Sequence, residues 1–148
     1  MIKVNKISTD WSTLPSGLTW YFIGQPKTGK TTNSSKWSEK GSEGVLIIDT
    51  DLGSDFVNNA NVVTVTGISP PRRTVEEDGK QVTEKGKPKV EIVPPKERGY
   101  YHRVGPNKGK PMEVYSLVEV LKWLTKDWKK LPYDTIVIDT VDQVNRWI

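Results

Sequence analysis

The stretch that decides the fold is Gly24-Gln-Pro-Lys-Thr-Gly29-Lys30-Thr31, near the start of a chain of 148 residues. It matches the pattern G-x-x-x-x-G-K-[ST], in which two glycines let the backbone curl until successive N–H groups point at phosphate oxygens. In such a loop the lysine, here Lys30, reaches the β- and γ-phosphates, and the hydroxyl of Thr31 coordinates Mg²⁺. The pattern therefore predicts a phosphate-binding loop with ATP and Mg²⁺ as cofactors. Its expected binding residues are Gly24, Gln25, Pro26, Lys27, Thr28, Gly29, Lys30, Thr31 and Thr32.

The segments on either side of this loop have the order that such a loop needs. The apolar run Leu18–Ile23 predicts a buried strand that ends at Gly24. After the loop, residues 30–40 are expected to form a helix closed by Gly41, since glycine commonly follows the last turn of a helix.

Further strands and a long helix are predicted along the chain. Residues 45–48 and 135–138 are short, continuous apolar runs, and residues 62–65 favour a third, shorter strand. Ser116 and Glu119 have the spacing of a helix capping box. The helix that follows is expected to present one apolar face and to stop at Pro132. That face is made by Leu117, Leu121, Leu124, Trp128 and Leu131. Buried strands that alternate with helices predict an α/β fold with a parallel sheet flanked by helices.

Two of the predicted strands end in aspartates. Asp139 follows the strand over 135–138 and fits a Walker B aspartate, which holds Mg²⁺ directly or through water. Asp49 and Asp51 follow the strand over 45–48. Because the carboxyl ends of parallel strands meet at one edge of a sheet, these carboxylates are expected near the phosphate loop. Hydrolysis needs a carboxylate that polarises the attacking water, and Asp51 is the candidate for that role.

Composition excludes several classes of site. The chain has no cysteine, which excludes disulfides and thiolate metal sites, and its single histidine, His102, excludes a zinc site built on a histidine pair. No apolar run is long enough to cross a membrane, and the N-terminus lacks the apolar core of a secretory signal. These features predict a cytoplasmic protein with no membrane partner.

The charge is concentrated in one segment. Residues 67–115 hold eleven Lys and Arg against seven Asp and Glu, so the whole net charge of +4 lies there. Seven of the ten prolines exclude a long helix in this segment, and Asp78-Gly79 favours a hairpin over residues 74–82. We expect one domain over residues 1–148 with a basic insertion at about 67–115. Cations interleaved with aromatic rings suit single-stranded DNA. The candidate DNA-binding residues are Arg72, Arg73, Lys96, Arg98, Tyr100, Tyr101 and Arg103. The alternative is a solvated loop without a ligand.

With these segments in view, the chain resembles the RecA-like P-loop ATPases. It is most similar to the phage-encoded group that includes single-strand-annealing recombinases. The matching segments are Gly24–Thr32, Val45–Asp55 and Tyr133–Gln143. The resemblance implies a catalytic carboxylate at Asp51 beside the catalytic Lys30, Mg²⁺ held by Thr31 and Asp139, and ATP hydrolysis coupled to recombination or annealing of DNA. It also implies a homo-oligomer and, for a phage protein, the host cytoplasm.

The chain departs from this family pattern in its order of strands. The resemblance implies a further strand between the phosphate-loop strand and the Walker B strand, and this sequence holds no candidate for it. We therefore expect an N-terminal part of a longer RecA-like core, possessing little activity alone. The alternative is a kinase-type sheet in which those two strands are neighbours. Two other functions stay open: a small-molecule or nucleotide kinase, and a nucleotide-gated scaffold that does not hydrolyse ATP.

Overall fold

The computed structural model describes Ile23 and residues 28–53 and 59–148. The chain divides into two compact units, Met1–Lys30 and Thr31–Ile148, and the fold below is that of the second. The strand predicted over residues 18–23, apart from Ile23, and the loop positions Gly24, Gln25, Pro26 and Lys27 lie outside the described residues.

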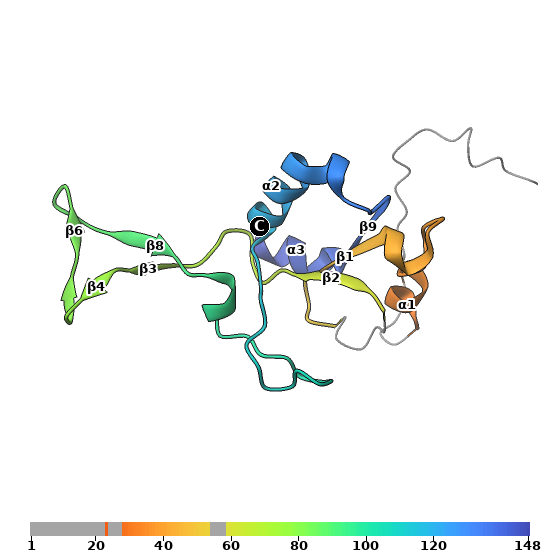
Figure 1. Ribbon diagram of the computed structural model, residues 1–148, viewed down its shortest axis with the longest axis horizontal. Coiled ribbons are helices and arrows are strands. Elements are labelled where there is room, and N and C mark those ends of the chain that lie inside the picture. The colour runs from red at the N-terminus through yellow and green to blue at the C-terminus, as the bar shows by residue number, and fades with distance from the viewer. Residues whose placement is uncertain (1–22, 24–27, 54–58) are drawn as a thin grey trace, which may run out of the picture. The chain divides into compact units, whose positions relative to one another are not determined.

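A three-stranded parallel sheet forms the centre of this unit (Figure 1). Its middle strand is β1, Val45–Asp49, which lies between β2, Asn61–Thr64, and β9, Thr135–Asp139. All five residues of β1 are buried, as expected for an apolar run without alternation. Three of the four predicted strands, those over residues 45–48, 62–65 and 135–138, and their parallel order are therefore confirmed. In the register of β1 and β9, Asp49 lies opposite Asp139, so the two strands end together.

Two helices, α2, Leu117–Asp127, and α3, Val141–Trp147, belong to the same unit as the sheet, and α2 contributes to its core. α2 begins at Ser116 with the predicted capping box: the Ser116 hydroxyl accepts the N–H of Glu119, and the Glu119 carboxylate accepts the N–H of Ser116. α3 follows β9 directly. The core joins Ile48 of β1 to Val65 and to Val120 of α2. None of the helices in the described part of the chain combines the length and the apolar character that crossing a membrane requires.

The helix after the phosphate loop is shorter than the predicted residues 30–40. It is α1, Lys30–Ser34, and a 3-10 helix, η2, follows at Gly41–Gly44. The hydroxyls of Ser34 and Ser35 donate to the carbonyls of Thr31 and Thr32. Such local bonds compete with helix continuation, and the polar segment has little apolar surface to hold it against the sheet. Gly41 has φ +64° and is the first residue of η2, so it is not the cap of a long helix.

Two predicted apolar faces are buried only in part. Ile136 and Ile138 of β9 are 51% and 47% exposed, so β9 alternates where a continuous buried run was expected. On α2 the buried face is centred on Val120, whereas Leu121 is half exposed. A 3-10 helix, η5, Trp128–Lys130, continues from α2 and turns Trp128 out of the predicted stripe, leaving it 62% exposed.

The basic segment contains an antiparallel stem that encloses two small hairpins, and we call these three paired units, residues 72–92, the three-hairpin arm (Figure 1). β3, Arg72–Thr74, pairs with β8, Val90–Ile92; β4, Glu76–Glu77, pairs with β5, Lys80–Gln81; and β6, Thr83–Glu84, pairs with β7, Lys87–Pro88. The hairpin predicted around Asp78-Gly79 is confirmed, with φ of +51° and +73° at its turn.

A ring of backbone hydrogen bonds joins the three paired units of this arm. The N–H of Val75 donates to the carbonyl of Lys89, Lys89 donates to Val82, and Val82 donates to Val75, at 2.8–2.9 Å. Main-chain bonds therefore hold the arm together, which suits a segment whose side chains are almost all exposed. After the arm a short 3-10 helix, η4, Pro95–Glu97, leads into the rest of the basic segment.

Candidate nucleotide-binding site

Two predicted magnesium ligands meet at the end of the sheet. Thr31, in the first turn of α1, donates a hydrogen bond from Oγ1 to Oδ2 of Asp139, the last residue of β9. The two residues are 108 positions apart in the sequence. The fold therefore brings together the threonine of the phosphate-loop pattern and the aspartate of the predicted Walker B strand.

The loop after β1 is built on Asp49. This aspartate is 2% exposed, and its Oδ1 accepts the N–H groups of Asp51 and Gly53, both at 3.2 Å. The N–H of Gly53 also donates to Oδ1 of Asp51 at 2.9 Å. Asp49 thus shapes the turn that carries Asp51, a role that its position at a strand end did not reveal.

Glycine is required at position 53 if Asp51 is to stay where it is. A Cβ at Gly53 would lie 2.7 Å from Oδ1 of Asp51, closer than side-chain carbons approach such atoms. Any other residue at position 53 would displace the Asp51 carboxylate.

Asp51 is exposed as a residue, yet its carboxyl group is partly desolvated. That desolvation raises the pKa of Asp51 above its ordinary value, and the hydrogen bond and negative charge of Asp49 act in the same direction. The charge of Asp139 raises this pKa as well, while the backbone hydrogen bond from Gly53 opposes the shift. A carboxylate with a raised pKa accepts a proton from water more readily, which suits the role predicted for Asp51.

Thr50 ties the two acidic strand ends together. Its N–H donates to the carbonyl of Asp139 at 2.7 Å, and its hydroxyl bonds to the backbone of Thr140. A cis peptide bond joins Asp139 to Thr140. Sequence reasoning missed Thr50, although the same Asp-Thr pair follows both strands and could have drawn attention to it.

The oxygen donors of this site fit Mg²⁺. A hydroxyl at Thr31 and a carboxylate at Asp139 are the oxygen ligands that this cation prefers. Among the described residues no group of three or more His, Cys, Asp or Glu is placed to hold a metal. Mg²⁺ usually takes one or two protein ligands and completes its coordination with phosphate and water, so the donor set suits a nucleotide-bound ion.

The predicted DNA-binding residues fall into two groups, and Arg98 differs most from the expectation. Its side chain is 2% exposed, and its guanidinium makes two 2.8 Å bonds to the Glu119 carboxylate. It also donates to the carbonyls of Val93 and Val114, both at 3.0 Å. These bonds, with Ser116, lower the pKa of Glu119 to about 2, Arg98 having the largest effect. Arg98 therefore holds the basic segment to α2 and is not presented to a phosphate.

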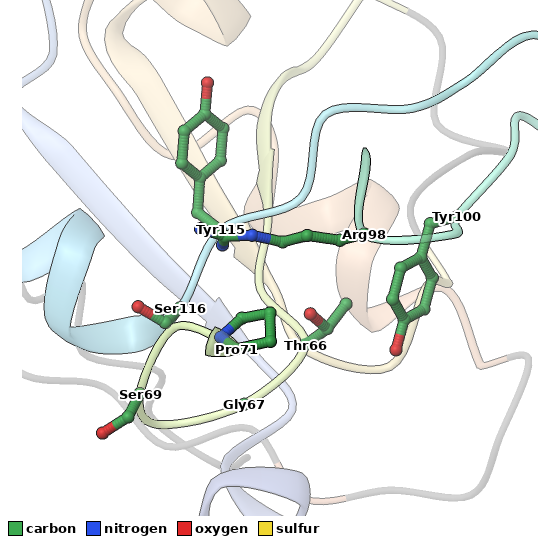
Figure 2. Close-up of a pocket in the computed structure, with 8 residues that line it drawn as sticks. All are labelled: Thr66, Gly67, Ser69, Pro71, Arg98, Tyr100, Tyr115 and Ser116. Atoms are coloured by element: carbon green, nitrogen blue, oxygen red, sulfur yellow. The ribbon is translucent and has the colours of Figure 1, made fainter. Parts of the chain in front are cut away.

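A hollow of about 260 Å³ surrounds Arg98 (Figure 2). Its wall is formed by the loop from Thr66 to Pro71, by Tyr100 and by the chain at Tyr115 and Ser116. In Figure 2 the Arg98 side chain runs toward the backbone at Tyr115. Because its bonds to Glu119 and the carbonyls engage the guanidinium, we assign this hollow a structural role.

The other candidates lie on the surface. Arg73 is paired with Glu91 and Glu97 at 2.7 Å each, and Lys96 with Glu113 at 3.2 Å. Arg72 and Arg103 are exposed, Tyr101 is 56% exposed, and Tyr100 is half buried. Arg72 and Tyr101 are thus the candidates best presented to a ligand, and Arg103 is exposed as well.

The phosphate-loop pattern, the parallel sheet and the meeting of Thr31 with Asp139 define a P-loop type of nucleotide-binding ATPase domain. Comparison with family models agrees: the model described as AAA domain matches residues 16–148. The chain belongs to this AAA domain family, whose members are generally nucleotide-binding ATPases. Neither the curated proteins nor the solved structures contain a significant match to it.

Proposed function

We propose that the protein is a Mg²⁺-dependent ATPase with a RecA-like core that acts on single-stranded DNA, in recombination or strand annealing. The proposal of a Mg²⁺-dependent ATPase is supported above all by the hydrogen bond from Thr31 to Asp139. In a protein that binds Mg-nucleotide, this pair must lie close enough to share one ion, and it does so across 108 positions of sequence.

Each group of residues in the proposed site has its own role. Gly24–Lys30 cradle the phosphates with backbone N–H groups, and Lys30 adds a positive charge at the β- and γ-phosphates. Thr31 and Asp139 hold Mg²⁺, which when bound neutralises charge on the phosphate oxygens. Asp51 orients a water and accepts its proton as the water oxygen bonds to the γ-phosphorus. The bond from that phosphorus to the bridging oxygen then breaks, and ADP leaves with the oxygen.

The DNA part rests on the resemblance and on the charge of the chain. The surplus of four positive charges lies entirely within residues 67–115, and the rest of the chain is balanced. Such a surplus attracts the phosphate backbone of a nucleic acid. The resemblance adds the expectation of a homo-oligomer encoded by a phage. A kinase would need a mobile, arginine-rich lid, for which residues 67–115 are the candidate segment, and in this segment Arg73 is held by two glutamates.

The ATPase proposal is tested by a matched pair at the magnesium site. Thr31→Ser keeps the hydroxyl, whereas Thr31→Ala removes it and leaves the short helix otherwise intact. We expect Thr31→Ser to bind Mg-ATP as the parent does. Thr31→Ala should lose about tenfold or more of the gain in ATP affinity that Mg²⁺ gives, measured by calorimetry with and without chelator. Equal binding by both variants would overturn the proposed magnesium site.

A further inference from the structure

The basic segment contains a further hairpin, separate from the three-hairpin arm. Main-chain hydrogen bonds join Met112 to Tyr100 at 2.8 Å, His102 to Lys110 at 3.0 Å and Gly109 to His102 at 2.9 Å. Tyr101 and Pro111 form a bridge between its two sides. We call residues 100–112 the basic hairpin. Since these bonds are all made by the backbone, the side chains of the hairpin can vary without opening it.

This hairpin has a net charge of +3, counted from its sequence. It has three Lys and Arg and no Asp or Glu, and all three cations are exposed: Arg103, Lys108 and Lys110. Among the described residues neither Lys108 nor Lys110 forms an ion pair with a carboxylate. Glu113, which follows the hairpin in sequence, is paired with Lys96 at 3.2 Å. A group of like charges such as Lys108 and Lys110 attracts phosphate.

The three-hairpin arm has a different character. Its residues 72–92 hold six Lys and Arg against five Asp and Glu. The strand register places Glu77 beside Lys80 and Glu84 beside Lys87. Arg73 is paired as well. Carboxylates opposite the cations repel phosphate, so this arm offers a polyanion little net attraction.

The basic hairpin also offers rings and a hollow. Tyr101 is 56% exposed. His102, Pro111 and Met112 line a hollow of about 500 Å³ together with Val62–Thr64 of the edge strand β2. The rest of its wall is Tyr115 and the paired Lys96 and Glu113. Exposed rings beside cations suit unstacked bases, which pair their flat faces with aromatic side chains while the phosphates meet the cations. A duplex keeps its bases stacked and cannot use these surfaces.

We propose that the basic hairpin is the site at which the protein binds single-stranded DNA, a proposal that rests on the DNA part of the proposed function. Arg103, Lys108 and Lys110 contact phosphates, and the ring of Tyr101 stacks on a base. The three-hairpin arm takes no part in this contact, although it carries more positive charges.

The test compares two triple variants of equal charge in the full chain. The first is Arg103→Gln, Lys108→Gln and Lys110→Gln; the control, in the arm, is Lys80→Gln, Lys85→Gln and Lys87→Gln. Binding of a fluorescein-labelled oligo(dT) is followed by anisotropy at several salt concentrations. We expect the hairpin variant to lose roughly tenfold or more in affinity. The slope of log K against log salt should become shallower by about 2, because each of three phosphate contacts on a single strand contributes about 0.7 to its size. The control should stay within about twofold of the parent, and an equal loss in both variants would overturn the location.

A second pair tests the stacking. Tyr101→Phe keeps the ring and should bind as the parent does, whereas Tyr101→Ala should lose about fivefold or more. Equal affinity of these two variants, or competition by duplex DNA as strong as by single strands at equal phosphate, would overturn the base contact. Mg-ATP binding is measured on the same samples. A chain that binds nucleotide but no oligo(dT) overturns the hairpin site and leaves the ATPase; a chain that binds oligo(dT) through the hairpin but no nucleotide overturns the ATPase alone.

Discussion

The hydroxyl of Thr50 both donates to the carbonyl of Thr140 and accepts the N–H of the same residue, each at 2.8 Å. Thr50 is 4% exposed and stands between Asp49 and Asp51, while Thr140 follows Asp139. One buried hydroxyl therefore links the loop that carries the proposed base to the residue that carries the proposed magnesium ligand. We infer that the relative position of Asp51 and Asp139 depends on this link.

Removal of that hydroxyl should lower turnover more than binding. Thr50→Val keeps the shape of the side chain but leaves the partly buried N–H and carbonyl of Thr140 without this partner, at a cost of about 1–3 kcal/mol in unfolding free energy. We expect Mg-ATP affinity near that of the parent and a kcat lower by about tenfold or more, because Asp51 loses its fixed position. Thr50→Ser should restore both properties. A Thr50→Val variant that is less stable but turns over normally would show a structural role only.

Substitution at Gly53 should affect the site without affecting the fold. The Cβ of alanine would lie 2.7 Å from Oδ1 of Asp51, the end of a side chain that can rotate away. Gly53→Ala should therefore reduce ATP turnover by about tenfold while thermal stability changes little. Gly41→Ala provides the reverse control. Its φ of +64° is strained for alanine and no atom lies near, so it should lose about 1 kcal/mol of stability and keep its turnover.

The pairing of Glu119 with Arg98 should appear in the acid stability of the protein. The folded-state pKa of Glu119 is about 2, below its ordinary value of 4.5. A lowered pKa adds stability that is fully present above pH 4.5 and is lost as the pH falls from there to about 2. Glu119→Gln removes this titration and leaves the guanidinium of Arg98, whose side chain is 2% exposed, without its carboxylate partner. At neutral pH the unfolding free energy should therefore fall by about 3 kcal/mol.

Chemical denaturation at pH 7 and at pH 3 measures this effect. The difference in unfolding free energy between the parent and Glu119→Gln should shrink at the lower pH. Lys96 and Glu113, both exposed, form a matched surface pair, and Glu113→Gln should change stability by less than about 1 kcal/mol. A constant difference for Glu119→Gln at both pH values would contradict the assignment.

The sequence predicted those parts of the fold that depend on local patterns. Val45–Asp49 is a continuous apolar run, and it forms the buried middle strand. The capping box at Ser116 and Glu119 and the turn at Asp78-Gly79 are short motifs with their own geometry, and both are present. The meeting of Thr31 with Asp139 followed from the rule that parallel strands end at one edge.

What the sequence could not predict depends on contacts between distant segments. The Glu119 side chain satisfies the helix cap and also binds Arg98, 21 positions earlier, and no local pattern marks the second role. The exposed side of β9 depends likewise on which neighbours cover an apolar face. The ring of bonds among Val75, Val82 and Lys89 is made by backbone groups and leaves no trace in residue types.

Asp51 and Asp139 should respond differently to the same change from carboxylate to amide. Asp139 accepts from Thr31 and is the proposed magnesium ligand, so Asp139→Asn should weaken Mg-ATP binding by about tenfold or more and lower turnover with it. Asp51 lies on the turn shaped by Asp49, and its raised pKa suits proton transfer from water. Asp51→Asn should therefore bind Mg-ATP like the parent and lose about a hundredfold or more in kcat. Calorimetry gives the first quantity and phosphate release the second. If Asp51→Asn hydrolyses ATP at the parent rate, another group accepts the proton; if Asp139→Asn binds Mg-ATP unchanged, the ion is held elsewhere.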